Sequence, residues 1–156
     1  MEFFSKALRR WMLTSRFKRY LGKGKLVVVK PQDHQLGLTT MLIHKCVLEG
    51  LVLLVPDQLE LTYTRRLFCS LYPELTHESM LFVRCVSSVR NNSARFNTNV
   101  RYLTDNSMTS RDLMGISYQV KAKIEGGFVC LNQSSSSTGL PKSLAISSRN
   151  TKHKRR

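Results

Sequence analysis

Apolar and polar positions follow one pattern in the first 24 residues and another in the rest of the chain. In residues 1–24, apolar side chains recur at helical spacing and basic side chains fill the remaining positions. The apolar stripe comprises Phe3, Phe4, Ala7, Leu8, Trp11, Met12, Phe17, Tyr20 and Leu21. This pattern predicts a basic amphipathic helix, with a break near Thr14.

From residue 25 the pattern changes to short apolar runs separated by helical segments. The run KLVVVKP is followed by TTMLIHKCVLEG, a helical pattern closed by Gly50, and then by the second apolar run LVLLVP. Continuous apolar strands separated by a helix indicate a βαβ unit with a parallel sheet. A second connecting helix is predicted from Asp57, as its N-cap, to the region of Pro73.

Further along the chain, MLFVRCVSSV predicts a strand, RNNS a turn, and ARFNTNVRYLTDN an extended segment. Residues 117–124 alternate between apolar and polar side chains, which predicts a half-exposed strand. Gly126 and Gly127 would then form a hairpin turn before FVCLN. The predicted fold class is α/β, with residues 25–133 forming a small, mainly parallel sheet that carries an edge hairpin.

Charge is concentrated at the two ends of the chain. The net charge is +15, of which residues 1–25 carry +7, residues 26–141 carry +2 and residues 142–156 carry +6. Residues 134–156 are polar and rich in serine, and predict a disordered basic tail. Such ends suit an anionic partner, and DNA or another nucleic acid is the predicted one. The predicted contacts are Arg9, Arg10, Arg16, Lys18, Arg19, Lys152, Lys154, Arg155 and Arg156.

Other interpretations of the first helix stay open. It could lie on a membrane surface, act as a targeting peptide, or simply dock on the domain with its basic face in water. The longest apolar runs are too short to cross a bilayer. The four cysteines stand singly in apolar runs and are interpreted as reduced core residues of a cytoplasmic protein. The four histidines are too scattered to suggest a metal site.

The segment KPQDHQLGLTT, which follows the first apolar run, has the position of a phosphate-binding loop. Such a loop joins a strand to a helix, wraps phosphates with backbone N–H groups, and carries a lysine and a Ser/Thr hydroxyl for Mg²⁺. Gly37 and Thr39 match that pattern, but Leu38 stands where the lysine belongs. An ordinary strand, loop and capped helix is the alternative interpretation.

At these residues the chain resembles the ATPase domain of tailed-phage terminase large subunits, which package DNA. Their deviant loops have the form Lys, small residue, Arg-Gln, apolar, Gly, any residue, Thr/Ser, after a basic, Trp-containing segment. Gln35, Gly37, Thr39 and Thr40 match, and His34 replaces the arginine. Lys30, two residues further from the glycine than usual, would supply the lysine. The resemblance implies ATP and Mg²⁺ as cofactors, with Thr39 on the metal.

The resemblance continues downstream. In these ATPases an edge hairpin and an Arg-Gly loop precede a strand that ends in Asp-Glu. NNSARF resembles the hairpin and RDLMGISY the loop, so the strand would end at Ile124 and Glu125. Glu125 would activate water, whereas Ile124 cannot bind Mg²⁺.

A competing alignment takes VRYLTDN as the catalytic strand. Asp105 is then the carboxylate on the metal side, FVCLN is the next strand, and Asn132 senses the terminal phosphate. An Asp-Asn turn with no function is the plain alternative. Arg65, Arg66, Arg90 or Arg95 could stabilise phosphate charge, although exposed surface arginine is the commoner role.

These observations predict a nucleotide-binding, terminase-like protein of a phage or mobile element, acting in a DNA transaction such as packaging. Its hydrolysis would be impaired, because a loop lysine and a strand aspartate are both missing. The alternative function is a basic, non-enzymatic nucleic-acid-binding protein. The expected location is the cytoplasm, that of the host if a phage encodes the chain, and assembly of several copies stays open.

Overall fold

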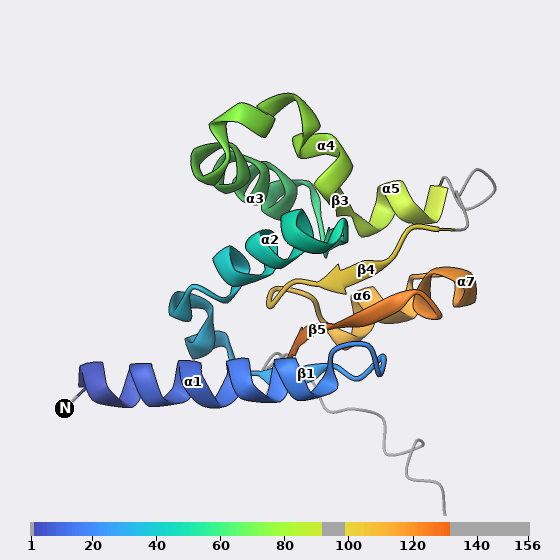
Figure 1. Cartoon of the computed structure of the whole chain (residues 1–156). Helices are drawn as coiled ribbons and strands as arrows, with labels where there is room; N and C mark the ends of the chain where they lie inside the picture. Colours follow the sequence, from blue (N-terminus) through green and yellow to red (C-terminus); the bar gives the residue numbers. More distant parts are fainter. Residues whose placement is uncertain (1, 92–98, 132–156) are drawn as a thin grey trace, which may run out of the picture.

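Five short parallel strands form one sheet in the part of the chain that the computed structural model describes, residues 2–91 and 99–131 (Figure 1). The strand order is β1-β5-β4-β2-β3, and every neighbouring pair is parallel. The strands are β1 (Val27–Val29), β2 (Val52–Val55), β3 (Val83–Cys85), β4 (Tyr102–Thr104) and β5 (Ile124–Cys130). The predicted α/β class with a mainly parallel sheet is therefore confirmed.

Helices connect the strands and cover both faces of the sheet. They are α1 (Glu2–Tyr20), α2 (Leu38–Glu49), α3 (Gln58–Leu71), α4 (Ser79–Phe82), α5 (Val86–Asn91), α6 (Ser110–Met114) and α7 (Tyr118–Lys121). Two 3₁₀ segments, η1 (Pro31–Leu36) and η2 (Pro73–Glu78), precede α2 and α4. The predicted helices after β1 and β2 are confirmed as α2 and α3. Asp57 caps α3 as predicted, since its carboxylate accepts the Glu60 N–H at 2.9 Å.

The sheet separates two apolar clusters, because successive side chains of a strand point to opposite faces. In β2, Leu53 and Val55 join one cluster, and Val52 and Leu54 join the other. The first cluster also holds buried side chains of α1, α2 and α3, whereas the second holds those of α5, α7 and the segment around Ile116. The sheet is thus a middle layer, buried by helices on each side.

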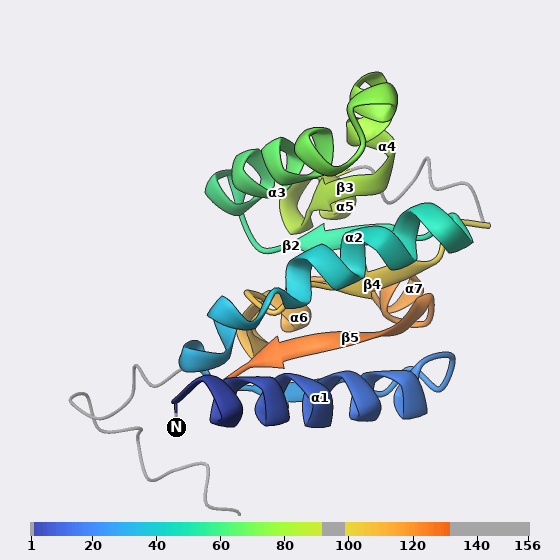
Figure 2. The ribbon, with the colours of Figure 1, turned by 60° about the vertical axis from the view of Figure 1, so that its left-hand side comes forward.

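Helix α1 packs along the side of the sheet formed by β1 and β5 (Figures 1 and 2). Leu13 and Phe17 are its buried residues, and the Phe17 ring stacks on that of Phe128 at a centroid distance of 5.5 Å. The predicted helix is confirmed, but it continues through Thr14 without a break. Its basic side chains Arg10, Arg16, Lys18 and Arg19 are exposed. Among the described residues, no helix has the length and apolar character needed to cross a bilayer.

Three predictions on local structure are corrected by the structure. Residues 117–124 do not form a strand: α7 spans Tyr118–Lys121, and β5 begins at Ile124. Gly126 and Gly127 lie inside β5 rather than in a hairpin turn. Only Val83–Cys85 is a strand in the segment 80–89, which is helical on either side. The edge hairpin resembling NNSARF and the disordered tail fall on residues outside the described ranges.

Candidate functional site

The first turn of α2 meets the carboxyl end of β4. The Thr39 hydroxyl donates a hydrogen bond to the Asp105 carboxylate at an Oγ1–Oδ1 distance of 2.9 Å. Asp105 directly follows β4 and is only 1% exposed. Its other oxygen accepts from the Ser107 hydroxyl at 2.5 Å and from the Ser107 N–H at 3.2 Å. The carboxylate is therefore fixed by three donors at the edge where parallel strands end.

Asn106 completes this arrangement. Its side-chain oxygen lies 3.0 Å from the Thr39 hydroxyl oxygen, and the residue is 3% exposed. A hydroxyl group has one proton, so Thr39 can donate fully to only one of its two neighbours, Asp105 or Asn106. Thr39 is thus the point at which α2 is joined to the segment after β4.

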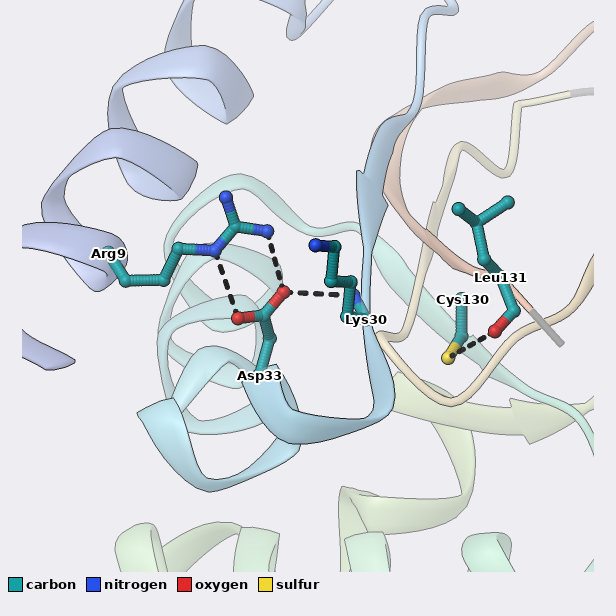
Figure 3. A network of polar contacts seen from close by, with 5 residues as sticks. All are labelled: Arg9, Lys30, Asp33, Cys130 and Leu131. Carbon is teal, nitrogen blue, oxygen red and sulfur yellow. Dashed lines mark hydrogen bonds and ion pairs between the residues drawn. The ribbon is translucent and has the colours of Figure 1, made fainter. Parts of the chain in front are cut away.

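The loop between β1 and α2 is a compact 3₁₀ turn held by a buried aspartate (Figure 3). Asp33 accepts two hydrogen bonds from Arg9 of α1, Nε–Oδ1 at 3.0 Å and Nη2–Oδ2 at 2.8 Å. It also accepts the backbone N–H of Lys30 at 2.8 Å. The hydrogen bond from Arg9 is the main reason why the pKa of Asp33 is lowered. The negative charge of Asp33 in this loop is therefore balanced by the Arg9 guanidinium of α1.

Gly37 joins η1 to α2 in the left-handed region, with φ of 69°. Side chains rarely adopt this conformation, so the glycine is required by its backbone angle. The three atoms nearest to a Cβ at Gly37 would all belong to the Arg10 guanidinium, at 3.9 Å.

Leu38, which takes the place of the usual lysine, is a core residue. It is fully buried at the start of α2, within the cluster that also contains Leu42. Lys30 is exposed, and Figure 3 shows its side chain pointing toward the Arg9–Asp33 pair. Its charge contributes to the lowered pKa of Asp33. Lys30 is thus oriented toward an existing carboxylate.

A groove of about 500 Å³ runs between α1 and the loop. Its lining is Phe3, Lys6, Ala7, Arg10, Trp11, Thr14, Gln35 and Leu36. Trp11 is 66% exposed and Phe3 is 87% exposed, so this wall of the groove is apolar and open to ligands. Arg10 lines this groove, and its guanidinium also lies next to Gly37.

Glu60, in the first turn of α3, brings another carboxylate to the same edge of the sheet. Partial burial raises its pKa, and the negative charges of Asp105 and Asp57 raise it further. The charge of His34 acts in the opposite direction. Glu60 is therefore a better proton acceptor than an ordinary surface glutamate at neutral pH.

The structure brings some predicted site residues together and separates others. Thr39 and Asp105 are in contact, as the competing alignment requires, and its two strands correspond to β4 and β5. Glu125 lies at the start of β5, at the opposite edge of the sheet, and pairs with Arg101 at 2.8 Å. Thr39 and Glu125, which the first alignment assigns to one nucleotide site, therefore lie at opposite edges of the sheet.

The remaining predicted residues are dispersed. Gln35 is exposed in the groove and Thr40 is half-buried beside Thr39. Arg65 donates to the Val83 carbonyl at 3.0 Å, which fits a structural role, and Arg66 is exposed. The positions outside the described residues are Arg95, Asn132, Lys152, Lys154, Arg155 and Arg156, and the side chain of Arg90 is not described either.

Sequence reasoning missed Arg10 as a neighbour of the loop, and Asn106, Ser107 and Glu60 as neighbours of Thr39 or Asp105. The run Asp-Asn-Ser after an apolar strand was the available sequence signal for Asn106 and Ser107. Arg10 and Glu60 come from distant elements that only the folded chain brings to this edge.

The oxygen atoms at this site suit Mg²⁺ bound together with a phosphate chain. Mg²⁺ is commonly held by one or two carboxylates, with substrate phosphates and water completing the octahedron. Thr39 and Asp105 would supply the protein oxygens, and the ion would neutralise phosphate charge. Within residues 2–91 and 99–131, there is no group of three or more His, Cys, Asp or Glu side chains that could hold a metal ion alone. Such an ion would therefore need the ligand's phosphates.

Comparison of the chain with family models, with curated proteins and with solved structures finds no match.

Proposed function

We propose that this protein binds a nucleoside triphosphate with Mg²⁺ at the first turn of α2. The observation that carries the proposal is the Thr39–Asp105 hydrogen bond of 2.9 Å. In phosphate-binding-loop NTPases, a Ser/Thr at the start of the helix after the loop and an aspartate at the end of another strand hold the metal together. Here one residue of each kind meets at the carboxyl edge of a parallel sheet, where ligands of open α/β folds bind.

The backbone at the start of α2 is suited to phosphate. The first helical hydrogen bond runs from the Met41 N–H to the Gly37 carbonyl at 3.3 Å. The N–H groups of residues 38–40 precede it and have no acceptor within the helix. These donors and the positive end of the helix dipole favour an anionic ligand. The three atoms nearest to a Cβ position on Gly37 belong to Arg10, whose long side chain can move aside for such a ligand.

The proposal extends to a terminase-like role in a DNA transaction, with impaired hydrolysis. Support for the terminase-like part is the resemblance of the loop and the five-stranded parallel sheet. In the alignment that uses Asp105, Asn106 stands where terminases carry the glutamate that activates water. An amide cannot accept a proton at neutral pH, so hydrolysis loses its general base.

Calorimetry with ATP and Mg²⁺ tests the proposal on the full chain. Wild type should bind ATP in a Mg²⁺-dependent manner, and Thr39→Ala and Asp105→Asn should each reduce the effect of Mg²⁺ on the affinity by about tenfold or more. Glu125→Gln is the matched control, since it neutralises a carboxylate at the opposite edge of the sheet, and should bind as wild type does. Circular dichroism verifies folding of each variant. Absence of saturable binding by wild type at millimolar ATP would refute the proposal.

Nucleic-acid binding is a second candidate function, and the exposed basic side chains of α1 favour it. Arg16, Lys18 and Arg19 are exposed although the same helix buries Leu13 and Phe17 in the core. The helix is thus rigidly placed while its charges face water. This function is compatible with nucleotide binding, because the two use different side chains.

A further inference from the structure

The proposed nucleotide site lacks the cation that such loops supply from within. The outer phosphates of a bound nucleotide carry charge that a lysine normally neutralises. Leu38 occupies that position and is fully buried. Lys30 points toward the Arg9–Asp33 pair instead (Figure 3). Another cation near the start of α2 would therefore be needed for tight binding.

Arg9 and Arg10 are neighbours in sequence but have different surroundings. The guanidinium of Arg9 is neutralised by two hydrogen bonds to Asp33. The guanidinium of Arg10 is exposed, and within residues 2–91 and 99–131 it makes no ion pair or hydrogen bond. Its three outer atoms Cζ, Nη1 and Nη2 each lie 3.9 Å from the position of a Cβ on Gly37. A free guanidinium thus stands beside the backbone that would carry the phosphates.

The fold fixes the position of Arg10. Leu13 and Phe17 anchor α1 in the core, and the Arg9–Asp33 pair joins the same turn of α1 to the loop. The backbone of Arg10 is therefore held in place by the contacts of the residues before and after it in α1. Its guanidinium lies beside Gly37 without any movement of the backbone.

The groove next to Arg10 has the size and lining for the remainder of a nucleotide. Its volume of about 500 Å³ lies within the range of small-molecule sites. Trp11, Phe3 and Leu36 give it apolar surface, and the Gln35 amide offers both a donor and an acceptor. Arg10 borders both this groove and Gly37, so the charged and apolar parts of one ligand would join beside its guanidinium.

We propose that Arg10 of α1 supplies the phosphate-binding cation that the loop itself lacks, with the nucleoside part of the ligand in the groove beside Trp11. This inference rests on the proposed nucleotide binding. A guanidinium has five donors in a planar fork that matches two phosphate oxygens, so it can replace the ammonium of a lysine. The cation would thus come from a helix that precedes the sheet in sequence.

The test uses the full chain, with calorimetry for affinity and the fluorescence of Trp11, the single tryptophan, for the groove. Arg10→Ala should weaken ATP binding by about 10- to 100-fold and leave adenosine binding within about twofold of wild type. Arg10→Lys should recover part of the ATP affinity. Lys23→Ala is the matched control, because it removes one exposed charge from the same N-terminal segment, and should bind ATP normally. ATP should change the Trp11 emission of wild type.

Two contrary results are distinguishable. If wild type binds ATP and Arg10→Ala binds it equally well, this inference is overturned and the proposed function stands. Equal loss of ATP and adenosine affinity in Arg10→Ala would also overturn it, because the arginine would then act on the groove rather than on phosphate. If wild type shows no ATP binding at all, the proposed function fails and this inference fails with it.

Discussion

Arg9 and Asp33 form a bidentate ion pair that connects α1 to the loop before α2 (Figure 3). The Asp33 side chain is 7% exposed and that of Arg9 is 33% exposed, so the carboxylate of this pair is largely shielded from water. The pair of Arg101 with Glu125 is more exposed, since the Arg101 side chain is 51% exposed and that of Glu125 is 23% exposed. The two pairs are therefore expected to differ in what they contribute to stability.

Replacing Asp33 by Ala should lower the free energy of unfolding by about 1–3 kcal/mol. The reason is that both the Arg9 guanidinium and the Lys30 N–H lose their acceptor in a partly desolvated place. Glu125→Ala is the matched control and should cost about 0–1 kcal/mol, the usual value for an exposed pair. Urea unfolding measures both changes, and equal costs for the two variants would contradict the prediction.

The contribution of Asp33 should depend on pH. The pKa of Asp33 in the folded state is lowered, mainly by the hydrogen bond from Arg9, whereas the pKa of an aspartate in an unfolded chain is about 3.9. At pH values between the folded and the unfolded pKa of Asp33, the unfolded state binds more protons than the folded state. The free energy of unfolding therefore rises with pH in this range. The advantage of wild type over Asp33→Asn should be complete above about pH 5 and disappear as pH falls through the lower folded value. Unfolding curves from pH 7 to pH 2 measure this, and a constant difference would refute it.

The parts of the fold that local patterns specify were predictable from the sequence. The apolar runs of β1 and β2, the helix between them and the Asp57 cap were each visible in a few consecutive residues. By contrast, no local pattern connects Thr39 with Asp105, which are 66 positions apart. The sequence offered two candidate carboxylates, Asp105 and Glu125, and only the order of the strands brings one of them to Thr39.

The error at residues 117–124 has a physical explanation. Alternation at positions 118, 120, 122 and 124 indicated a strand, but Ile116, Val120 and Ile124 also recur at the helical spacing of four. The structure buries these three and leaves Tyr118 85% exposed; only Tyr118–Lys121 between them is helical, and Ile124 begins β5. A glycine pair marks turns as well as close backbone contacts, so the pattern at Gly126 and Gly127 alone does not distinguish a turn from a strand.

Gly127 should be intolerant of any side chain. Its φ is 126°, and a Cβ would lie 2.4 Å from the Thr104 carbonyl oxygen in the neighbouring strand. Gly127→Ala should therefore destabilise the protein by about 2–5 kcal/mol, from backbone strain and overpacking together. Gly126→Ala is the matched control, because its Cβ would approach other atoms only to 3.5 Å. Thermal unfolding compares the two, and a similar loss in both would show that the close approach is not the cause.

ATP hydrolysis should be weak, and what remains should depend on Glu60. Asn106 follows Asp105 and cannot accept a proton, whereas Glu60 is a carboxylate in the first turn of α3 whose pKa is raised by partial burial and by the charges of Asp105 and Asp57. A positioned base contributes about 10²- to 10⁴-fold to such a reaction. Glu60→Gln should thus abolish the residual phosphate release while ATP binding is retained. Rapid turnover by wild type, or an unchanged rate in Glu60→Gln, would contradict this prediction.

The exposed basic face of α1 should bind duplex DNA in a strongly salt-dependent way. Deleting α1 would not test this, because Leu13 and Phe17 belong to the core. The suitable variant replaces Arg16, Lys18 and Arg19 by Ala in the full chain. If each charge neutralises one phosphate, the slope of log K against log salt should fall by about 2–3, since each contact contributes about 0.9.

The control for this experiment removes three basic residues elsewhere, Arg111, Lys121 and Lys123 in and after α6 and α7. It has the same net charge as the α1 variant, so it separates a defined binding face from general attraction. Fluorescence anisotropy with a labelled duplex at several salt concentrations measures both slopes. We expect a loss in the α1 variant alone. Equal losses would mean that DNA responds to the +15 charge of the whole chain, and α1 would then be a docked helix whose basic face merely lies in water.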